Sequence, residues 1–497
     1  MEYLDVYVVA PNTLSNMAWR VHQPVLTNDS LKGRFERMND VEAWTLVGAE
    51  KHRELREQQN SALLYLRDTL DSSADIQGPG LPMSAFSRIE VIDADVGASI
   101  GFFLLAVVGI AAVVAIIIAL TKESCPFIYA YNEEGCHFEG EVFSGAVSPQ
   151  LQRHDRLPLP HLGPVDGRYR VRVANKAREI QRTDLAELLV VDHPEGSMVL
   201  FDRDGSARTI SAPVEPSGAT DQSGRDAMAL IASADDRAWQ GDPTNDRPNA
   251  DEYLDVSFPR PQGVASGRLV ITARNTFWAD QLYGMFLDEF GSKADALRER
   301  MQKRTAEEMR QWAREQYLPL SVSMKVGPDR WERIGQFELA GPMAWRQDVL
   351  EIDLSRATGE RIELRLGSGF MFWQIDAVAF DTSTQIPVAI QRLQPDSAID
   401  QAGRDVRASM LFEDGDLLVQ PAVGDAVELS FRCPAPLAGM HRSLFLHAAG
   451  HYEILREPRS HEPDMRYLRG FKEPGALSRY SRERWNELGS LTVERAL

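Results

Sequence analysis

The amino-acid sequence predicts a mainly β protein with some α-helix, divided into several domains and carrying a single transmembrane helix. Three observations support this fold class. The chain has 497 residues, which is more than one domain usually holds. Short alternating apolar segments bounded by turn residues recur along most of it, as is typical of β-strands. One uncharged apolar stretch, residues 97–121, is long enough to cross a bilayer.

The apolar stretch reads GASIGFFLLAVVGIAAVVAIIIALT. As a helix it spans roughly 37 Å at ~1.5 Å per residue, against about 30 Å of hydrocarbon. We therefore expect a transmembrane helix, with a buried core helix as the alternative. Gly97 and Gly101 have the G-x-x-x-G spacing that lets two membrane helices approach closely. The alternative for these glycines is a small-residue end of the helix.

The pattern of apolar and turn residues divides the rest of the chain into four further segments. Residues 1–96 predict a small α+β domain, with a solvated helix within 48–70. Residues 122–258 predict a β-rich domain, and residues 259–385 predict a pair of helices followed by a β-sandwich. Residues 386–497 predict a C-terminal β region and a polar tail. No internal repeat of fixed period is evident.

Within 259–385, helices are expected near 276–290 and 292–317. Ser292 and Asp295 resemble a capping box at the start of the second helix. Apolar residues then recur at helical spacing, which indicates a core-facing stripe. The strands that follow come at short intervals, and this spacing predicts the sandwich.

Composition and motifs argue against several functions. The net charge of −19 disfavours a nucleic-acid partner, because phosphates are neutralised by clustered Lys and Arg. The sequence has no Walker loop, no dinucleotide-binding fingerprint and no H-E-x-x-H. We therefore assign no catalytic residue, no cofactor and no metal, and expect a protein that is not an enzyme. His447 and His451 are four residues apart on a predicted strand and share a face, so they are either packed histidines or part of a metal site.

Two small groups of residues remain as candidate sites. Cys125 and Cys136 lie eleven residues apart and form either a disulfide or two free thiols. Three tryptophans of the predicted sandwich suggest an aromatic surface on which a sugar stacks, although some of the surrounding aromatic residues belong in the core; they are Trp331, Trp345 and Trp373.

The stretch SCPFIYAY at 124–131, directly after the apolar segment, resembles an uncharacterised group of bacterial envelope proteins. In that group a short β domain and a membrane helix precede a Ser-Cys-Pro-Phe-x-Tyr stretch and β-rich modules. The resemblance covers most of the chain, and further markers lie at 166–196, 274–291, 370–381 and 396–416. It implies an architecture and an envelope setting, but no activity. Residues 318–381 also resemble a galactose-binding-type jelly roll in their strand pattern.

These expectations combine into one functional hypothesis. The chain is expected to be a non-enzymatic, membrane-anchored scaffold or accessory subunit that stabilises a larger membrane complex, for example a respiratory or photosynthetic one. Its partners would be other membrane subunits and the lipid bilayer. The expected location is the bacterial cell membrane, with a single pass and the large C-terminal region in the periplasm. The alternative is an envelope module that binds glycans, and an envelope hydrolase ranks last.

Overall fold

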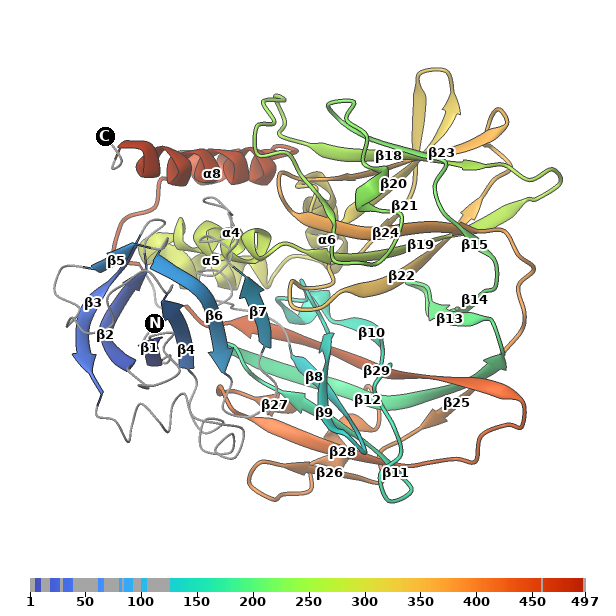
Figure 1. Cartoon of the computed structure of the whole chain (residues 1–497), viewed down its shortest axis with the longest axis horizontal. Coiled ribbons are helices and arrows are strands. Elements are labelled where there is room, and N and C mark those ends of the chain that lie inside the picture. Colours follow the sequence, from blue (N-terminus) through green and yellow to red (C-terminus); the bar gives the residue numbers. More distant parts are fainter. Residues whose placement is uncertain are drawn as a thin grey trace. The chain divides into compact units, whose positions relative to one another are not determined.

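The computed structural model describes residues 5–9, 18–26, 30–38, 61–66, 80–82, 85–92, 100–104, 126–456 and 459–494. They belong to two compact units. Unit 1 comprises residues 1–122 and 487–497, and unit 2 comprises residues 123–486. The described part of the chain is dominated by strands arranged in several sheets (Figure 1), which confirms the mainly β class.

Unit 1 contains a seven-stranded sheet in the order β5-β3-β2-β1-β4-β6-β7. Its strands are β1 (Asp5–Val9), β2 (Ala18–Leu26), β3 (Ser30–Arg37), β4 (Ser61–Leu66), β5 (Gly80–Pro82), β6 (Phe86–Ile92) and β7 (Ile100–Leu104). β1 and β4 are parallel, and the other neighbours are antiparallel. The helix predicted within 48–70 is wrong for residues 61–66. There Leu64 and Leu66 are both buried, and burial of residues two apart is the pattern of a strand.

The predicted transmembrane segment is only partly described. Ile100–Leu104 forms β7 and pairs with β6, so these residues are not helical. Their isoleucine and phenylalanines suit a strand once a neighbouring strand offers backbone partners. Residues 97–99 and 105–121 lie outside the described residues. Across the described ranges, no helix has both the length and the apolar character that a membrane span requires.

Unit 2 contains two β-sandwiches. Sandwich 1 pairs the sheet β26-β28-β11-β8-β9 with the sheet β10-β29-β12-β25, to which β27 is added beside β12. Val171 and Leu429 of the first sheet share one core with Leu188 and Leu446 of the second. Its strands are β8 (Phe127–Asn132), β9 (Gly135–Glu141), β10 (Arg153–Pro158), β11 (Arg168–Ala174), β12 (Glu179–Pro194), β25 (Ala389–Leu393), β26 (Ser397–Asp400), β27 (Leu418–Gln420), β28 (Ala426–Arg432) and β29 (Met440–Ile454).

Sandwich 2 pairs the sheet β16-β18-β23-β20-β21 with the sheet β15-β24-β19-β22, with β17 beside β24. The rings of Phe258 and Phe380 meet between its sheets, 5.3 Å apart. Its strands are β15 (Pro213–Val214), β16 (Gly218–Asp221), β17 (Trp239–Gln240), β18 (Glu252–Pro259), β19 (Ser266–Asn275), β20 (Leu320–Gly327), β21 (Arg330–Phe337), β22 (Arg346–Asp353), β23 (Arg361–Ser368) and β24 (Trp373–Asp381). Sandwich 2 is therefore inserted between the two halves of sandwich 1.

The two sandwiches are copies of one plan, with the same strand order in corresponding sheets. The clearest sequence signal is a turn that follows the edge strand, ATDQSGRD at 219–226 and AIDQAGRD at 398–405. In both turns an Arg Nε donates to an Asp at 2.7 Å, Arg225 to Asp221 and Arg404 to Asp400. The chain thus contains an internal repeat, although its copies follow no fixed period. Because the halves of one copy enclose the other copy, corresponding residues are not equally spaced.

A hairpin, β13 (Met198–Phe201) with β14 (Ala207–Ile210), lies between the sandwiches (Figure 1). Val199 and Phe201 pack on the outer face of sandwich 1. Leu200 and Ile210 pack on sandwich 2 instead. Because successive strand residues point to opposite faces, the two faces of one short hairpin pack against different sandwiches and so join them.

The predicted pair of helices is confirmed, although the second is broken. The helical elements after β19 are α4 (Phe277–Asp288), η5 (Gly291–Lys293), α5 (Ala294–Met301) and α6 (Ala306–Glu315). The capping box forms at Thr305 and Glu308 rather than at Ser292, which donates to Glu462. The break separates α5 from α6. The C-terminal helices are α7 (Met465–Gly470) and α8 (Ala476–Glu494).

Candidate functional site

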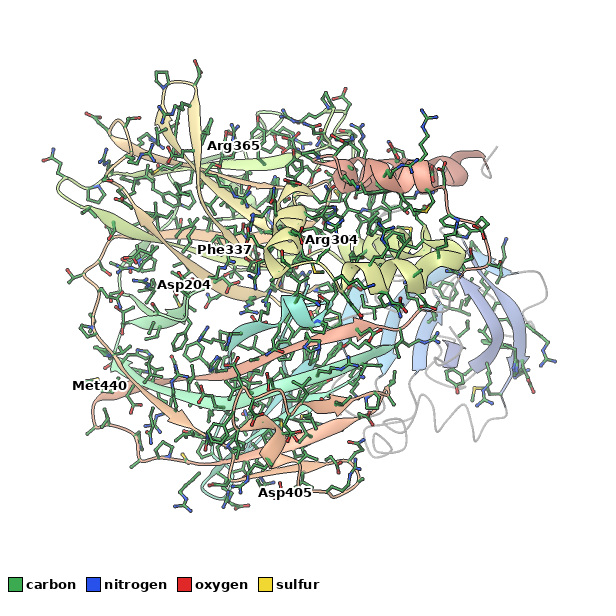
Figure 2. The ribbon with its side chains drawn as sticks, turned by 180° about the vertical axis from the view of Figure 1, so that it is seen from behind. Asp204, Arg304, Phe337, Arg365, Asp405 and Met440 are labelled. Carbon is green, nitrogen blue, oxygen red and sulfur yellow. The ribbon has the colours of Figure 1, made fainter. Side chains whose placement is uncertain are left out.

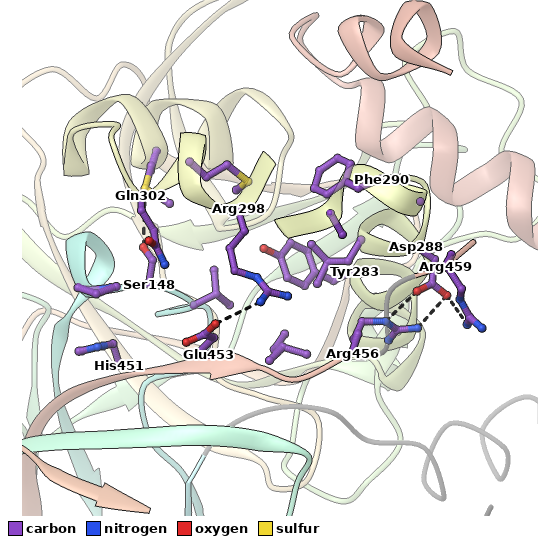
Figure 3. Close-up of a pocket in the computed structure, with 18 of the residues that line it drawn as sticks. Ser148, Tyr283, Asp288, Phe290, Arg298, Gln302, His451, Glu453, Arg456 and Arg459 are labelled. Carbon is purple, nitrogen blue, oxygen red and sulfur yellow. Dashed lines mark hydrogen bonds and ion pairs between the residues drawn. The ribbon is translucent and has the colours of Figure 1, made fainter. Parts of the chain in front are cut away.

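A cavity of about 230 Å³ lies where α4, α5 and the start of α6 cover the end of β29 in sandwich 1 (Figure 3). Its walls are largely apolar, formed by Val147, Tyr283, Leu287, Phe290, Met301, Met309 and Ile454. Its polar residues are Ser148, Arg182, Asp288, Arg298, Gln302, His451, Glu453, Arg456 and Arg459. A water needs only about 10–15 Å³ of such space, so the cavity has room for a small organic molecule.

His451 forms one wall of this cavity and is 3% exposed. Its Nδ1 lies 3.3 Å from Oε1 of Gln152, whose Nε2 donates to Asp184 at 2.8 Å. Because a carboxylate only accepts, Asp184 fixes the amide, and the amide oxygen then requires a proton on Nδ1. The His451 Nε2 is left as a lone pair, buried and without a hydrogen-bond partner among the described residues. Burial and the charge of Arg182 lower the pKa of His451 to about 4, so the ring is neutral at pH 7.

Asp184 is positioned by a β-bulge in β12, between Thr183 and Leu185. Its Oδ1 also accepts from the backbone N–H of Gly415, at 3.1 Å. Sandwich 2 has a bulge at the corresponding position, where Asp376 accepts from the backbone of Asp235. Both sandwiches therefore have an aspartate at this bulge, and in sandwich 1 the aspartate contacts a buried histidine through Gln152.

The polar side of the cavity carries more positive than negative charge. Arg298 lies 3.3 Å from Glu453, and Arg182 lies 3.8 Å from the same carboxylate. Arg456 donates two bonds to Asp288, at 3.0 and 2.9 Å, and Arg459 adds a third (Figure 3). Four arginines and two carboxylates line the cavity, and Arg298 also lies 3.5 Å from Asp295. Burial would raise the pKa of Asp288, but the bonds from the two arginines hold it below its usual value.

A second cavity, about 300 Å³, lies between the sandwiches and contains a buried ion cluster. Asp155 of β10 accepts from Arg153 at 2.7 Å and from Arg346 of β22 at 2.9 Å. It also accepts from the backbone N–H of Phe143. Burial opposes ionisation of Asp155, but the two guanidinium charges outweigh it and hold its pKa well below the usual range. The cluster joins the two sandwiches by charge, beside the hairpin that joins them by apolar packing.

A third buried group is Glu252, at the start of β18 in sandwich 2. Its Oε2 accepts from the backbone N–H of Met371 at 2.8 Å. Burial raises the pKa of Glu252 to about 8, and the neighbouring charge of Asp242 adds to the rise. The side chain is 2% exposed. It therefore acts as a largely protonated structural group at neutral pH.

The structure does not bring the predicted tryptophans together on one surface. Trp373 is 2% exposed and donates to the carbonyl of Leu318, so it belongs to the core of sandwich 2. Trp331 lies on β21, with the guanidinium of Arg365 4.3 Å from its ring centre. Arg365 is among the residues labelled in Figure 2. Trp345 precedes β22 and is covered in the same way by Arg274, at 4.1 Å.

The other predicted site residues are placed only in part. Cys136 lies on β9 as a free, half-buried thiol, while Cys125 lies outside the described residues, so the disulfide stays a prediction. Gly101 lies in β7 and Gly97 lies outside the described residues. His447 is packed: its Nδ1 is 2.6 Å from Glu187 and its Nε2 is 3.0 Å from His154. Over the described ranges, His, Cys, Asp and Glu form no group of three or more that could hold a metal.

Comparison with known proteins yields no family. No family model matches, and no curated protein matches. Among solved structures, a chain of Sulfolobus Turreted Icosahedral Virus is 7% identical, with a TM-score of 0.13, over 61% of this chain and 91% of that chain. A chain from a study of a triple jelly roll fold and turret assembly in an archaeal virus gives 7% and 0.13, over 60% and 89%. The GH31 α-xylosidase of Xanthomonas citri gives 10% and 0.14, over 89% and 38%. TM-scores this low establish no common fold.

Proposed function

We propose that this chain is a non-enzymatic scaffold protein that holds partner proteins in a fixed relation through its two sandwiches. The observation that carries the proposal is the double junction between them. Phe201 on one face of the hairpin packs edge-on against Phe445 of sandwich 1, with ring centres 4.9 Å apart, while the other face packs on sandwich 2. The Asp155–Arg346 pair adds a buried ionic link.

This junction suits a scaffold because domains that share only a small polar contact move relative to one another. Here the contact is apolar and ionic, and the chain passes from sandwich 1 into sandwich 2 and back. Both connections therefore restrict the second sandwich. Such a body presents surfaces on its two halves at a constant distance and angle.

Attachment to a membrane complex is the finer part of this proposal. It depends on residues 105–121, which remain uncharged and apolar in sequence. A helix formed by those residues would still approach the shortest length that spans a bilayer. The partners would then be other membrane subunits, as the sequence led us to expect.

Native gel electrophoresis after mild detergent extraction of membranes tests the proposal. The full chain should migrate in an assembly well above its own 55.6 kDa, together with partners in constant ratio. Migration of all the protein as a monomer would contradict a scaffold role. Recovery of an assembly from the soluble fraction alone would contradict membrane attachment but leave the scaffold role intact.

A further inference from the structure

Histidine is distributed unevenly between the two sandwiches, although they are copies of one plan. Residues 213–381, which form sandwich 2, contain none, whereas sandwich 1 holds seven of the ten histidines in the chain. Because histidine changes charge between pH 5 and 8, the candidates for a response to pH lie in sandwich 1. Six of the seven form stacked pairs, with ring centres 5.0, 5.2 and 6.4 Å apart: His137 with His161, His154 with His447, and His193 with His441.

The pair His154–His447 lies in a polar row that crosses one sheet of sandwich 1, from β10 over β29 and β12 to β25 (Figure 1). The His447 Nδ1 donates to Glu187 of β12 at 2.6 Å, and Arg392 of β25 donates to the same oxygen. The His447 Nε2 lies 3.0 Å from the His154 Nδ1. At the other end of the row, the His154 Nε2 lies 3.2 Å from a carboxylate oxygen of Glu413, which belongs to the loop before β27. The pair therefore has a carboxylate at each end.

The protons of the two imidazoles can be counted from these contacts. Burial would raise the pKa of Glu187, but the bonds from His447 and Arg392 hold it below its usual value, so Glu187 is a carboxylate. Because a carboxylate only accepts, one proton lies on the His447 Nδ1 and a second lies between the two rings. Two neutral rings have no third proton, so a lone pair of the His154 Nε2 would face the carboxylate of Glu413. This contact is attractive only when the pair has taken up one more proton.

The charges around His154 decide where the extra proton is taken up. Burial is the largest cause and lowers the pKa of His154 from its usual 6.5. Glu413 raises this pKa, His447 and Arg156 lower it, and Asp155 raises it. The pair is therefore uncharged at neutral pH and gains its proton in mildly acidic solution. Because Glu413 favours the proton, the pair holds it more tightly when the loop is in contact, and by linkage the proton favours the contact.

The loop that carries Glu413 is residues 411–417, between η6 (Arg407–Met410) and β27. The backbone N–H of Gly415 donates to Asp184 at 3.1 Å, and this bond does not use the shared proton of the histidines. Phe412, next to Glu413, is 61% exposed. The contact of Glu413 with His154 therefore adds a second, proton-dependent anchor to the loop, beside an apolar ring on the surface.

We propose that the loop of residues 411–417 is a pH-dependent latch, which protonation of the His154–His447 pair closes onto sandwich 1 and loss of that proton releases. Closing holds Phe412 in one place on the surface, and release frees it. One proton passes between solvent and the imidazole pair, and no covalent bond between heavy atoms changes. The latch consists of residues of sandwich 1 alone, so the inference is independent of the scaffold role.

Hydrogen exchange of the full chain at about pH 5 and about pH 7.5, read by mass spectrometry and corrected for the intrinsic effect of pH, tests the latch. Peptides covering 411–417 should exchange about threefold more slowly at the lower pH. The factor is modest because the His154 and Glu413 side chains are 41% and 40% exposed. Peptides covering 320–327, from β20, report global stability in the same spectra. Equal protection of 411–417 at both pH values, or a change that 320–327 shares, would overturn the latch.

Glu413→Gln and Asp414→Asn form a matched pair of variants. Both remove one negative charge from the same exposed loop. The asparagine of Asp414→Asn keeps the oxygen that accepts from the N–H of Asp416 at 3.0 Å. Glu413→Gln should abolish the difference between the two pH values, and Asp414→Asn should retain it. A difference that survives Glu413→Gln, or one that Asp414→Asn removes, would overturn the inference.

His154→Gln tests the imidazole side of the latch. His154 is exposed on β10, and glutamine takes up no proton in this range, so the loop should exchange equally at both pH values. His441→Gln is the control, because His441 is an exposed histidine of the same sandwich that lies 3.8 Å from a different carboxylate, Glu195. The pH difference should persist in this control. Its persistence in His154→Gln, or its loss in His441→Gln, would refute the assignment of the switch to His154 and His447.

Discussion

Replacing Asp155 by Asn isolates the ionic part of the junction between the sandwiches. The change keeps the size of the side chain but removes the charge that Arg153 and Arg346 share, at 2.7 and 2.9 Å. Asp155 is 2% exposed, so little solvent screens the loss. Removing one partner of a buried ion pair lowers the free energy of unfolding by about 3–5 kcal/mol. We expect a loss of this size, because two largely buried guanidinium groups would lose the carboxylate that they share, which leaves Asp348 beside Arg346 and the more distant Glu338 near Arg153.

Urea unfolding followed by circular dichroism and by tryptophan fluorescence measures this loss. Asp204→Asn is the matched control: Asp204 is exposed on the hairpin loop (Figure 2), and its change should stay within about 0.5 kcal/mol. The fluorescence transition of Asp155→Asn should move to lower urea and broaden if the sandwiches separate before they unfold. Equal stability of the two variants would show that the ion cluster does not hold the junction, and would refute the reasoning.

Three further predictions follow from the same structure. Stability should fall in acid, because the pKa of Asp155 is lower in the folded protein than in the unfolded chain. The contribution of Asp155 to stability is present above about pH 4 and is lost as the pH drops towards the folded value. Asp155→Asn should therefore weaken the pH dependence of stability in acid. Glu252 has the opposite effect, because its pKa is about 8 in the folded protein and 4.5 in the unfolded chain. The free energy of unfolding should therefore fall as pH rises from 4.5 to 8, and Glu252→Gln should remove this pH dependence in urea titrations. Phe201→Ala should cost about 3–5 kcal/mol in thermal unfolding, against a negligible cost for Val214→Ala on the surface.

The fold class could be predicted from sequence because strand alternation is local. β20, for example, buries Leu320, Val322 and Met324 and leaves the residues between them half-exposed, as its pattern indicates. The α4 helix was likewise expected, near 276–290. The pairing of strands was not, because β12 finds its partner β29 some 250 residues later, and no local signal carries such a register. The paired copies of A-x-D-Q-x-G-R-D are the clearest sequence signal of the repeat.

The candidate site could be predicted only in fragments. His451 was expected on a strand, but its hydrogen bonds depend on Gln152, which precedes β10, and on Asp184 of β12. The place of Arg298 likewise depends on α5 and β29 lining one cavity, which no local pattern in the sequence encodes. The predicted aromatic surface failed because the sequence does not show what covers each tryptophan. Trp373 is buried in the core, and an arginine lies over the ring of each of the other two. Tertiary context decides such cases, and sequence alone does not contain it.

The most direct test of the scaffold role is the stoichiometry of the assembly that the full chain forms in detergent-extracted membranes, measured by native mass spectrometry for the unaltered protein and for Asp155→Asn. The scaffold proposal predicts one constant ratio of partners for the unaltered chain, and loss of at least one partner when the junction is loosened. A lone 55.6 kDa species, or an assembly that Asp155→Asn leaves intact although the junction has measurably loosened, would contradict it.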